Sequence, residues 1–134
     1  MKTILVVDND RNVLALAGII LGKLGHSVLK ARSPEEAMAL FPGKRKLDLL
    51  VTDIRLGPVD GFQLASVLKI ERPLLPVLHI SADISDASRL LAESGPHADE
   101  HFLRKPFLPK ELSDMATLLL RPAKGELVLK QSGF

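Results

Sequence analysis

The chain has 134 residues, of which 46% are apolar and 25% are charged, and it contains no cysteine. This composition excludes a disordered chain and thiolate sites, and no apolar run reaches the roughly 18 residues that a membrane span needs. The formal net charge is only +2, and the chain has no Trp or Tyr, so binding to nucleic acid or to a membrane is not expected. We expect one globular domain. The start of the chain lacks the cleavage site of a secretory signal, which favours a cytoplasmic location.

The first half of the chain alternates short apolar runs with helical patterns. After the first apolar run, Asp10 can cap a helix whose apolar residues recur at helical spacing up to Gly25. The second helix opens on a capping box at 33–36. The predicted elements of this half are strands at 3–7, 27–31 and 47–52 and helices at 11–24 and 34–41.

The second half continues the alternation. Its predicted elements are helices at 61–72, 85–94 and 109–121 and strands at 76–80 and 101–103. Five strands alternating with five helices predict an α/β fold with a parallel sheet and right-handed crossovers. Residues 1–121 then form a single domain, and residues 122–134 are either a short tail or the beginning of a linker to an output domain.

Polar side chains follow four of the predicted strands at their carboxyl ends. They are Asp8, Asn9 and Asp10 after the first strand, Asp53 after the third, Ser81 after the fourth and Lys105 after the fifth. Each residue alone is more often a helix cap or a solvated charge. Because function in open α/β sheets collects at these strand ends, we expect one pocket to hold the set. Two nearby carboxylates repel each other, and Mg²⁺, which prefers oxygen ligands, would relieve this repulsion.

Four parts of the sequence carry a family resemblance. They are residues 4–10, residues 50–53 with 59–62, residues 81–82, and residues 102–107. In these segments the chain resembles response-regulator receiver domains, the phosphoaspartate switches of two-component signalling. The resemblance implies a flavodoxin-like receiver fold, with a doubly wound five-stranded sheet in the order 2-1-3-4-5 and helices on both faces. It also implies a stand-alone signalling module that is not an enzyme beyond its own phosphorylation and dephosphorylation.

The resemblance assigns the phosphoryl chemistry to three residues. Asp53 would be the phosphoacceptor, and Ser81 and Lys105 would bind the oxygens of the transferred phosphoryl group. Phe102 takes the position of the aromatic switch residue and would rotate inward when Ser81 moves. The peptide bond between Lys105 and Pro106 would be cis, which an X-Pro bond allows at modest cost.

The resemblance also implies a magnesium site. Its ligands would be Asp8, Asn9, Asp53 and the backbone carbonyl of Arg55. The family usually has a second carboxylate where this chain has Asn9, so we expect weaker Mg²⁺ binding, with Asp10 as a less well placed substitute. The alternative interpretation is that Asn9 only caps the first helix.

Three further residues need an interpretation. Arg55 and Asp83 lie two positions beyond the acceptor and the hydroxyl, where the family has the path of the attacking water. A pair between them could slow hydrolysis of the phosphoaspartate, although an exposed pair is often worth under about 1 kcal/mol. His79 falls within a predicted strand and is expected to be a hydrogen-bonded core imidazole, and no zinc site is expected.

The implied partners are a histidine kinase or phosphotransfer protein as donor, and a downstream protein or a second copy of the chain as receiver of the signal. The surface that they would read consists of the helix at 85–94, the strand at 101–103 and the last helix. Two other functions stay open. The first is a module that acts by docking alone and has weakened phosphorylation. The amide at Asn9 favours this interpretation, and the presence of Asp53, Ser81 and Lys105 counts against it. Residues 8–10 also resemble the motif of haloacid-dehalogenase-type phosphatases, in which Asp8 would be the nucleophile and Asp53 would have no role.

Overall fold

The computed structural model describes residues 1–83, 85, 88 and 97–121. The elements are β1 (Thr3–Val7), α1 (Arg11–Lys23), β2 (Ser27–Ala31), α2 (Pro34–Leu40), β3 (Leu49–Asp53), α3 (Gly61–Glu71), β4 (Val77–Ser81), β5 (His101–Arg104) and α5 (Pro109–Leu119). The strands form one parallel sheet in the order β2-β1-β3-β4-β5. The predicted α/β fold and its strand order are confirmed. Among the described residues, no helix is long and apolar enough to cross a membrane.

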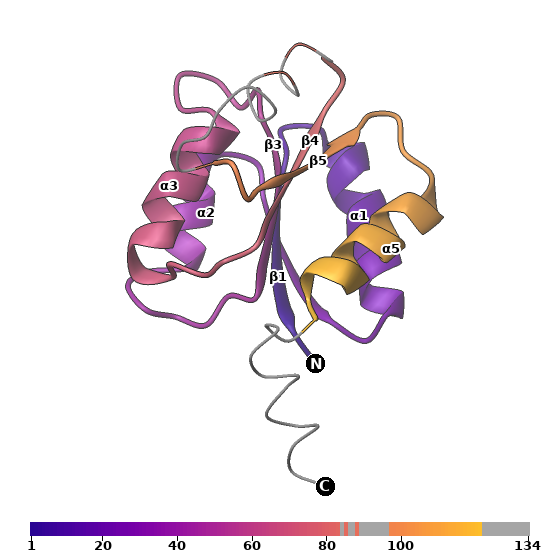
Figure 1. Ribbon diagram of the computed structural model, residues 1–134, viewed down its shortest axis with the longest axis horizontal. Coiled ribbons are helices and arrows are strands. Elements are labelled where there is room, and N and C mark those ends of the chain that lie inside the picture. Colours follow the sequence, from indigo (N-terminus) through magenta and orange to yellow (C-terminus); the bar gives the residue numbers. More distant parts are fainter. Residues whose placement is uncertain (84, 86–87, 89–96, 122–134) are drawn as a thin grey trace, which may run out of the picture.

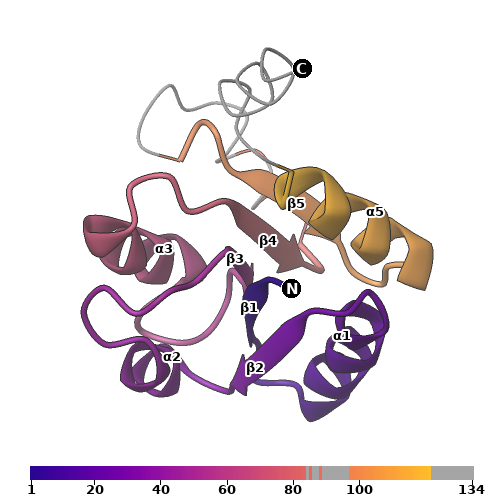
Figure 2. The same cartoon turned by 90° about the horizontal axis from the view of Figure 1, so that it is seen from below.

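The sheet lies between two layers of helices. Helices α1 and α5 cover one face, and α2 and α3 cover the other (Figure 1; Figure 2). Because side chains alternate along a strand, β1 gives Ile4 and Val6 to the core under α1 and α5, and Leu5 and Val7 to the core under α2 and α3. Burial on both faces explains why the central strands β1, β3 and β4 are mainly apolar runs rather than alternating ones, whereas the edge strands β2 and β5 are only partly buried.

Two strands extend further toward the polar residues than predicted. The prediction ended the third strand at residue 52 and the fourth at residue 80, whereas β3 includes Asp53 and β4 includes Ser81. The parallel ladder continues through these polar positions, and the amide of Ile54 still donates to the carbonyl of Ile80 at 3.2 Å. Asp53 and Ser81 are therefore held by the sheet itself. The predicted helix at 85–94, apart from residues 85 and 88, and the segment 122–134 lie outside the described residues.

The beginning of α3 packs directly on the end of β3. The amide of Gly61 donates to the carbonyl of Ile54 at 2.8 Å. A Cβ at position 61 would overlap the carbonyl oxygen of Asp53 and lie 3.0 Å from the Cα of Ile54, so only glycine fits there. A capping box fixes the same turn, since Asp60 and Gln63 exchange hydrogen bonds of 2.8 and 2.9 Å. The helix start thus supports the backbone that carries Asp53.

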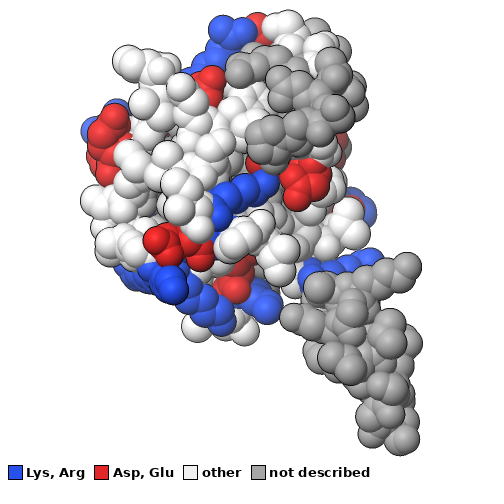
Figure 3. Space-filling view, turned by 60° about the vertical axis from the view of Figure 1, so that its left-hand side comes forward, with Lys and Arg blue, Asp and Glu red and all other residues white. Residues whose placement is uncertain are grey.

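Charged residues of both signs are spread over the surface. On the face shown in Figure 3, the described Lys and Arg side chains alternate with Asp and Glu and with uncharged residues, and no patch of a single sign covers that face. This distribution agrees with the small net charge of +2. The described residues on this face form no continuous basic footprint of the kind that nucleic-acid binding uses.

Candidate functional site: two carboxylates and one ammonium

Three residues from three strand ends meet at the carboxyl edge of the sheet. Asp8 follows β1, Asp53 ends β3 and Lys105 follows β5. Nζ of Lys105 lies 2.7 Å from Oδ2 of Asp8 and 3.0 Å from Oδ2 of Asp53. Asp8 is fully buried, and Asp53 is 8% exposed. The predicted strand-end cluster therefore contains a shared ammonium between two carboxylates, and of the two carboxylates only Asp53 opens slightly to solvent.

Burial and charge compete in this cluster. Burial raises the pKa of Asp8, and the nearby charge of Asp53 adds to the rise, while hydrogen bonds from Lys105 and from the amide of Asp10 oppose it. Burial alone would lower the pKa of Lys105, but its hydrogen bonds to Asp8 and Asp53 outweigh burial and raise it. When both carboxylates are ionised, one ammonium leaves a net negative charge at the cluster. The site therefore favours a further cation.

The donor chemistry of the cluster fits Mg²⁺. Both carboxylates are held in place by backbone amides, because Oδ1 of Asp8 accepts from Asp10 at 2.8 Å and Oδ1 of Asp53 accepts from Arg55 at 3.2 Å. Within the described part of the chain, no three acidic or histidine side chains are grouped as metal ligands. A magnesium ion here would therefore depend on two carboxylates, with backbone oxygen and water completing its shell, as Mg²⁺ commonly does.

The two residues that follow Asp8 have separate positions. Asp10 is the N-cap of α1, and its Oδ1 accepts from the amide of Asn12 at 2.8 Å. The prediction that Asp10 caps this helix is confirmed, and the alternative that Asn9 caps it is wrong. Asn9 is exposed. The capping hydrogen bond engages one oxygen of the Asp10 carboxylate at the start of α1, and Asp10 is not among the partners of Lys105.

Ser81 and the segment around Lys105 complete this edge. Ser81 is buried, and its Oγ accepts from the amide of Asp83 at 3.1 Å. The amide of Lys105 donates to the carbonyl of Ser81 at 2.9 Å, and the peptide bond between Lys105 and Pro106 is cis. Phe102 is half-buried and packs against Phe62 and its neighbours on the α3 side of the sheet. Ser81 and Lys105 are thus joined through their backbones.

Arg55 and Asp83 form the pair that their positions suggested. Nη2 of Arg55 lies 2.6 Å from Oδ2 of Asp83, with side chains 63% and 42% exposed. Hydrogen bonds from the hydroxyl and amide of Ser85 lower the pKa of Asp83, and the charge of Arg55 adds to this effect. The pair joins the loop after β3 to the loop after β4.

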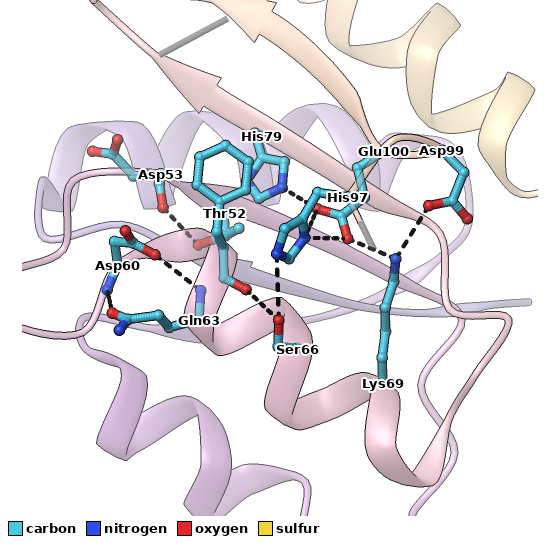
Figure 4. Close-up of polar contacts among 11 residues, drawn as sticks. Thr52, Asp53, Asp60, Gln63, Ser66, Lys69, His79, His97, Asp99 and Glu100 are labelled. Atoms are coloured by element: carbon cyan, nitrogen blue, oxygen red, sulfur yellow. Dashed lines mark hydrogen bonds and ion pairs between the residues drawn. The ribbon is translucent and has the colours of Figure 1, made fainter. Parts of the chain in front are cut away.

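A second buried polar cluster, which the sequence did not predict, surrounds Glu100 (Figure 4). Its carboxylate is 2.6 Å from Nε2 of His79, 2.6 Å from Nζ of Lys69 and 2.9 Å from Nδ1 of His97. We refer to Lys69, His79, His97 and Glu100 as the Glu100 network. His79 is the hydrogen-bonded core imidazole that was expected. The only sequence signal for its partner is that a histidine inside a buried strand needs one.

The Glu100 network predicts acid-sensitive stability. Burial alone would raise the pKa of Glu100, but hydrogen bonds from His79, Lys69 and His97 lower it from 4.5 to about 2. The resulting stabilisation is complete above pH 4.5 and is lost as the pH falls toward 2. Between pH 4.5 and 2 we expect the free energy of unfolding of the parent to fall by on the order of 3 kcal/mol more than that of Glu100→Gln, measured by urea unfolding. Asp99→Asn is the control and should behave as the parent; equal pH slopes in parent and Glu100→Gln would contradict the assignment.

Comparison with known proteins is consistent with this geometry. A family model described as the response regulator receiver domain matches residues 4–117. The chain is 31% identical over 121 residues to the alkaline phosphatase synthesis transcriptional regulatory protein PhoP of Bacillus subtilis (strain 168), covering 90% of this chain and 49% of that protein. It is 30% identical over 120 residues to the probable transcriptional regulator ycf27 of Porphyridium aerugineum, covering 90% and 48%. The chain spans about half the length of the curated relatives it matches.

Solved receiver domains share the fold. The receiver domain of NtrX from Brucella abortus superposes with a TM-score of 0.77 at 30% identity, covering 90% of this chain and 99% of that one. The DrrB receiver domain activated with BeF3 gives a TM-score of 0.77 at 26% identity, covering 90% and 97%.

Proposed function

Because the chain belongs to the response regulator receiver domain family, we propose that it accepts a phosphoryl group on Asp53 in two-component signalling. The observation that best supports this proposal is the ammonium of Lys105 between the carboxylates of Asp8 and Asp53, at 2.7 and 3.0 Å. A cation fixed at the acceptor can stabilise negative charge that arrives with the phosphoryl group.

The proposed reaction is a direct transfer. A carboxylate oxygen of Asp53 attacks the phosphorus of a phosphohistidine or a small phosphodonor, and the bond from phosphorus to the leaving group breaks with its electron pair. The leaving group then takes a proton from solvent. Lys105 and Ser81 bind the transferred oxygens, and Mg²⁺ held at Asp8 and Asp53 would neutralise charge on the phosphoryl group. The side chains thus provide position and charge, and no further covalent intermediate is needed.

The two alternative functions are not favoured. A phosphatase that uses Asp8 needs an accessible nucleophile, but Asp8 is fully buried. A module that acts by docking alone has no need of a carboxylate pair desolvated around one ammonium. Asp53, by contrast, is the carboxylate of the cluster that retains some exposure.

This chain has a candidate docking surface for the donor protein beside the site. A mostly apolar groove runs along α1 and the segment after β5, and it is lined by Val13, Leu16, Ala82, Lys105, Pro106 and Phe107. Because Lys105 lines both the groove and the acceptor cluster, a histidine kinase or phosphotransfer protein seated there would hold its phosphohistidine near Asp53. On the output side, the described elements of the proposed surface are β5 and α5. A downstream protein or a second copy of the chain would bind there.

Phosphorylation of Asp53 is tested with acetyl phosphate and Mg²⁺, followed by intact mass and peptide mapping. We expect the parent to gain the mass of one phosphoryl group on Asp53 and Asp53→Asn to gain none, because an amide oxygen is a poor nucleophile. Asp8→Asn, a matched change in the same cluster, should still be modified on Asp53, but more slowly. A phosphoryl group found on Asp8, or an unmodified parent, would contradict the proposal.

Asn9→Asp tests the effect of the amide on metal binding. The substitution adds one negative charge next to Asp8 at the mouth of the cluster, so we expect Mg²⁺ to bind severalfold more tightly, measured by isothermal titration calorimetry. Asn12→Asp adds the same charge one helical turn away and should change the affinity much less. Equal affinities in Asn9→Asp and the parent would show that position 9 takes no part in binding.

Arg55→Ala tests the pair at the mouth of the site. We propose that the pair of Arg55 with Asp83 hinders the attacking water, so its loss should shorten the lifetime of the phosphorylated protein severalfold in a phosphate-release assay. Arg121→Ala, an exposed arginine after α5, is the control and should leave the lifetime unchanged. A lifetime that is the same in Arg55→Ala and the parent would show that the pair has no gating role.

A further inference from the structure

The Glu100 network lies beside the switch position Phe102 on the same face of the sheet. His79 and Phe102 are register partners in β4 and β5, so their side chains project from the same face. The ring centroid of Phe62 lies 4.4 Å from that of His79 and 5.1 Å from that of His97. Phe102 packs against the cluster that contains Phe62. The ring of Phe62 therefore connects the network to the switch position.

The hydrogen-bond partners of the network fix the protons on His79. The carboxylate of Glu100 is ionised near neutral pH and can only accept hydrogen bonds, so Nε2 of His79 must be the donor. Nδ1 of His79 is buried and has no hydrogen-bond partner among the described residues. A proton on Nδ1 would be left unpaired there, so the hydrogen bond to Glu100 is the one that the ring can make among the described residues. In this hydrogen bond, Nε2 of His79 is therefore always the donor and the buried carboxylate of Glu100 is always the acceptor.

Glu100 joins three parts of the fold immediately before β5. Lys69 comes from α3, His79 from β4, and His97 from the segment that leads to Glu100 (Figure 4). Ser66 of α3 adds a contact of 3.4 Å to Nε2 of His97. The side chain of Glu100 is only 1% exposed, so these contacts compete little with water. They hold the backbone two residues before Phe102.

We propose that the Glu100 network positions Phe102 and resists its rearrangement, and so sets how readily phosphorylation of Asp53 moves the switch. The inference rests on the proposed function, because it takes Asp53 as the acceptor and Phe102 as the switch. Glu100 and His79 are positioning residues, since they act through Phe62 and the start of β5. Loosening the network should favour the rearranged position of Phe102 before any phosphoryl group is present.

Glu100→Gln and Asp99→Asn form a matched pair for the test. Both remove one carboxylate charge from the same segment, but Asp99 is 81% exposed and contacts only Lys69 among the described residues, at 3.5 Å. A glutamine at position 100 offers one acceptor oxygen and turns an NH₂ group toward donors, so it breaks the network without changing side-chain size. Lys69→Met removes one donor to Glu100 and is the second variant if Glu100→Gln does not fold.

The test combines NMR of ring-labelled phenylalanine with a titration of beryllium fluoride in the presence of Mg²⁺. The Phe102 signal is assigned with Phe102→Leu. In Glu100→Gln we expect this signal to shift toward its beryllium fluoride-bound position before any addition, and the half-saturating concentration to fall at least threefold. Asp99→Asn should match the parent in both readouts. If Glu100 had a purely structural role, Glu100→Gln would lower stability without shifting the Phe102 signal toward its beryllium fluoride-bound position.

Two outcomes separate the inference from the proposed function. If the parent responds to beryllium fluoride but Glu100→Gln matches Asp99→Asn or binds more weakly, the positioning role is wrong while the acceptor role stands. If the parent does not respond, the acceptor role is wrong. The ring-flip rate of Phe102 then decides the positioning role, which is supported by a rate that rises in Glu100→Gln alone and overturned by an unchanged rate.

Discussion

The site depends on one electrostatic constraint: two carboxylates share a single ammonium at the edge of a buried sheet. Ionising Asp8 in this setting is costly, as its raised pKa indicates, and Lys105 offsets only part of the cost. The arrangement persists because the strand ladder, the backbone amides and the glycine at position 61 hold the acceptor edge from several sides. A site with unbalanced negative charge is suited to take up a divalent cation and then a phosphoryl group.

The same principle applies to the buried charge on the α3 side of the sheet, Glu100. Its charge is paired with the ammonium of Lys69, and its carboxylate also accepts hydrogen bonds from two histidines. The two clusters therefore have different consequences. The carboxylate pair lacks one cation and can bind ligands, whereas the Glu100 network is satisfied internally and holds its segment in place. Under the proposed function, the carboxylate edge would accept the phosphoryl group, and the Glu100 network would support the proposed switch position, Phe102.

Much of the fold and of the reactive edge could be predicted from local patterns. Buried parallel strands appear as apolar runs, and caps such as Ser33 and Asp60 mark helix starts. Asp8, Asp53 and Lys105 could be grouped because each follows a strand and parallel strands end at one edge. The strand order came from the family resemblance. The ends of β3 and β4 were set too early because the backbone ladder continues through Asp53 and Ser81, and polar side chains do not signal this.

The Glu100 network could not be predicted because, apart from the contact with His97 three residues away, its contacts are not local. His79 and Glu100 are 21 residues apart, and Lys69 and Glu100 are 31 apart, with no periodicity that links them. The most direct measurement of the central claim is an NMR titration of the lysine side chains at high pH. Lys105 should keep its proton to higher pH in the parent than in Asp53→Asn, because Asp53 accepts one of the hydrogen bonds that raise its pKa. If Lys105 titrates at the same pH in both proteins, the shared ammonium does not exist in solution.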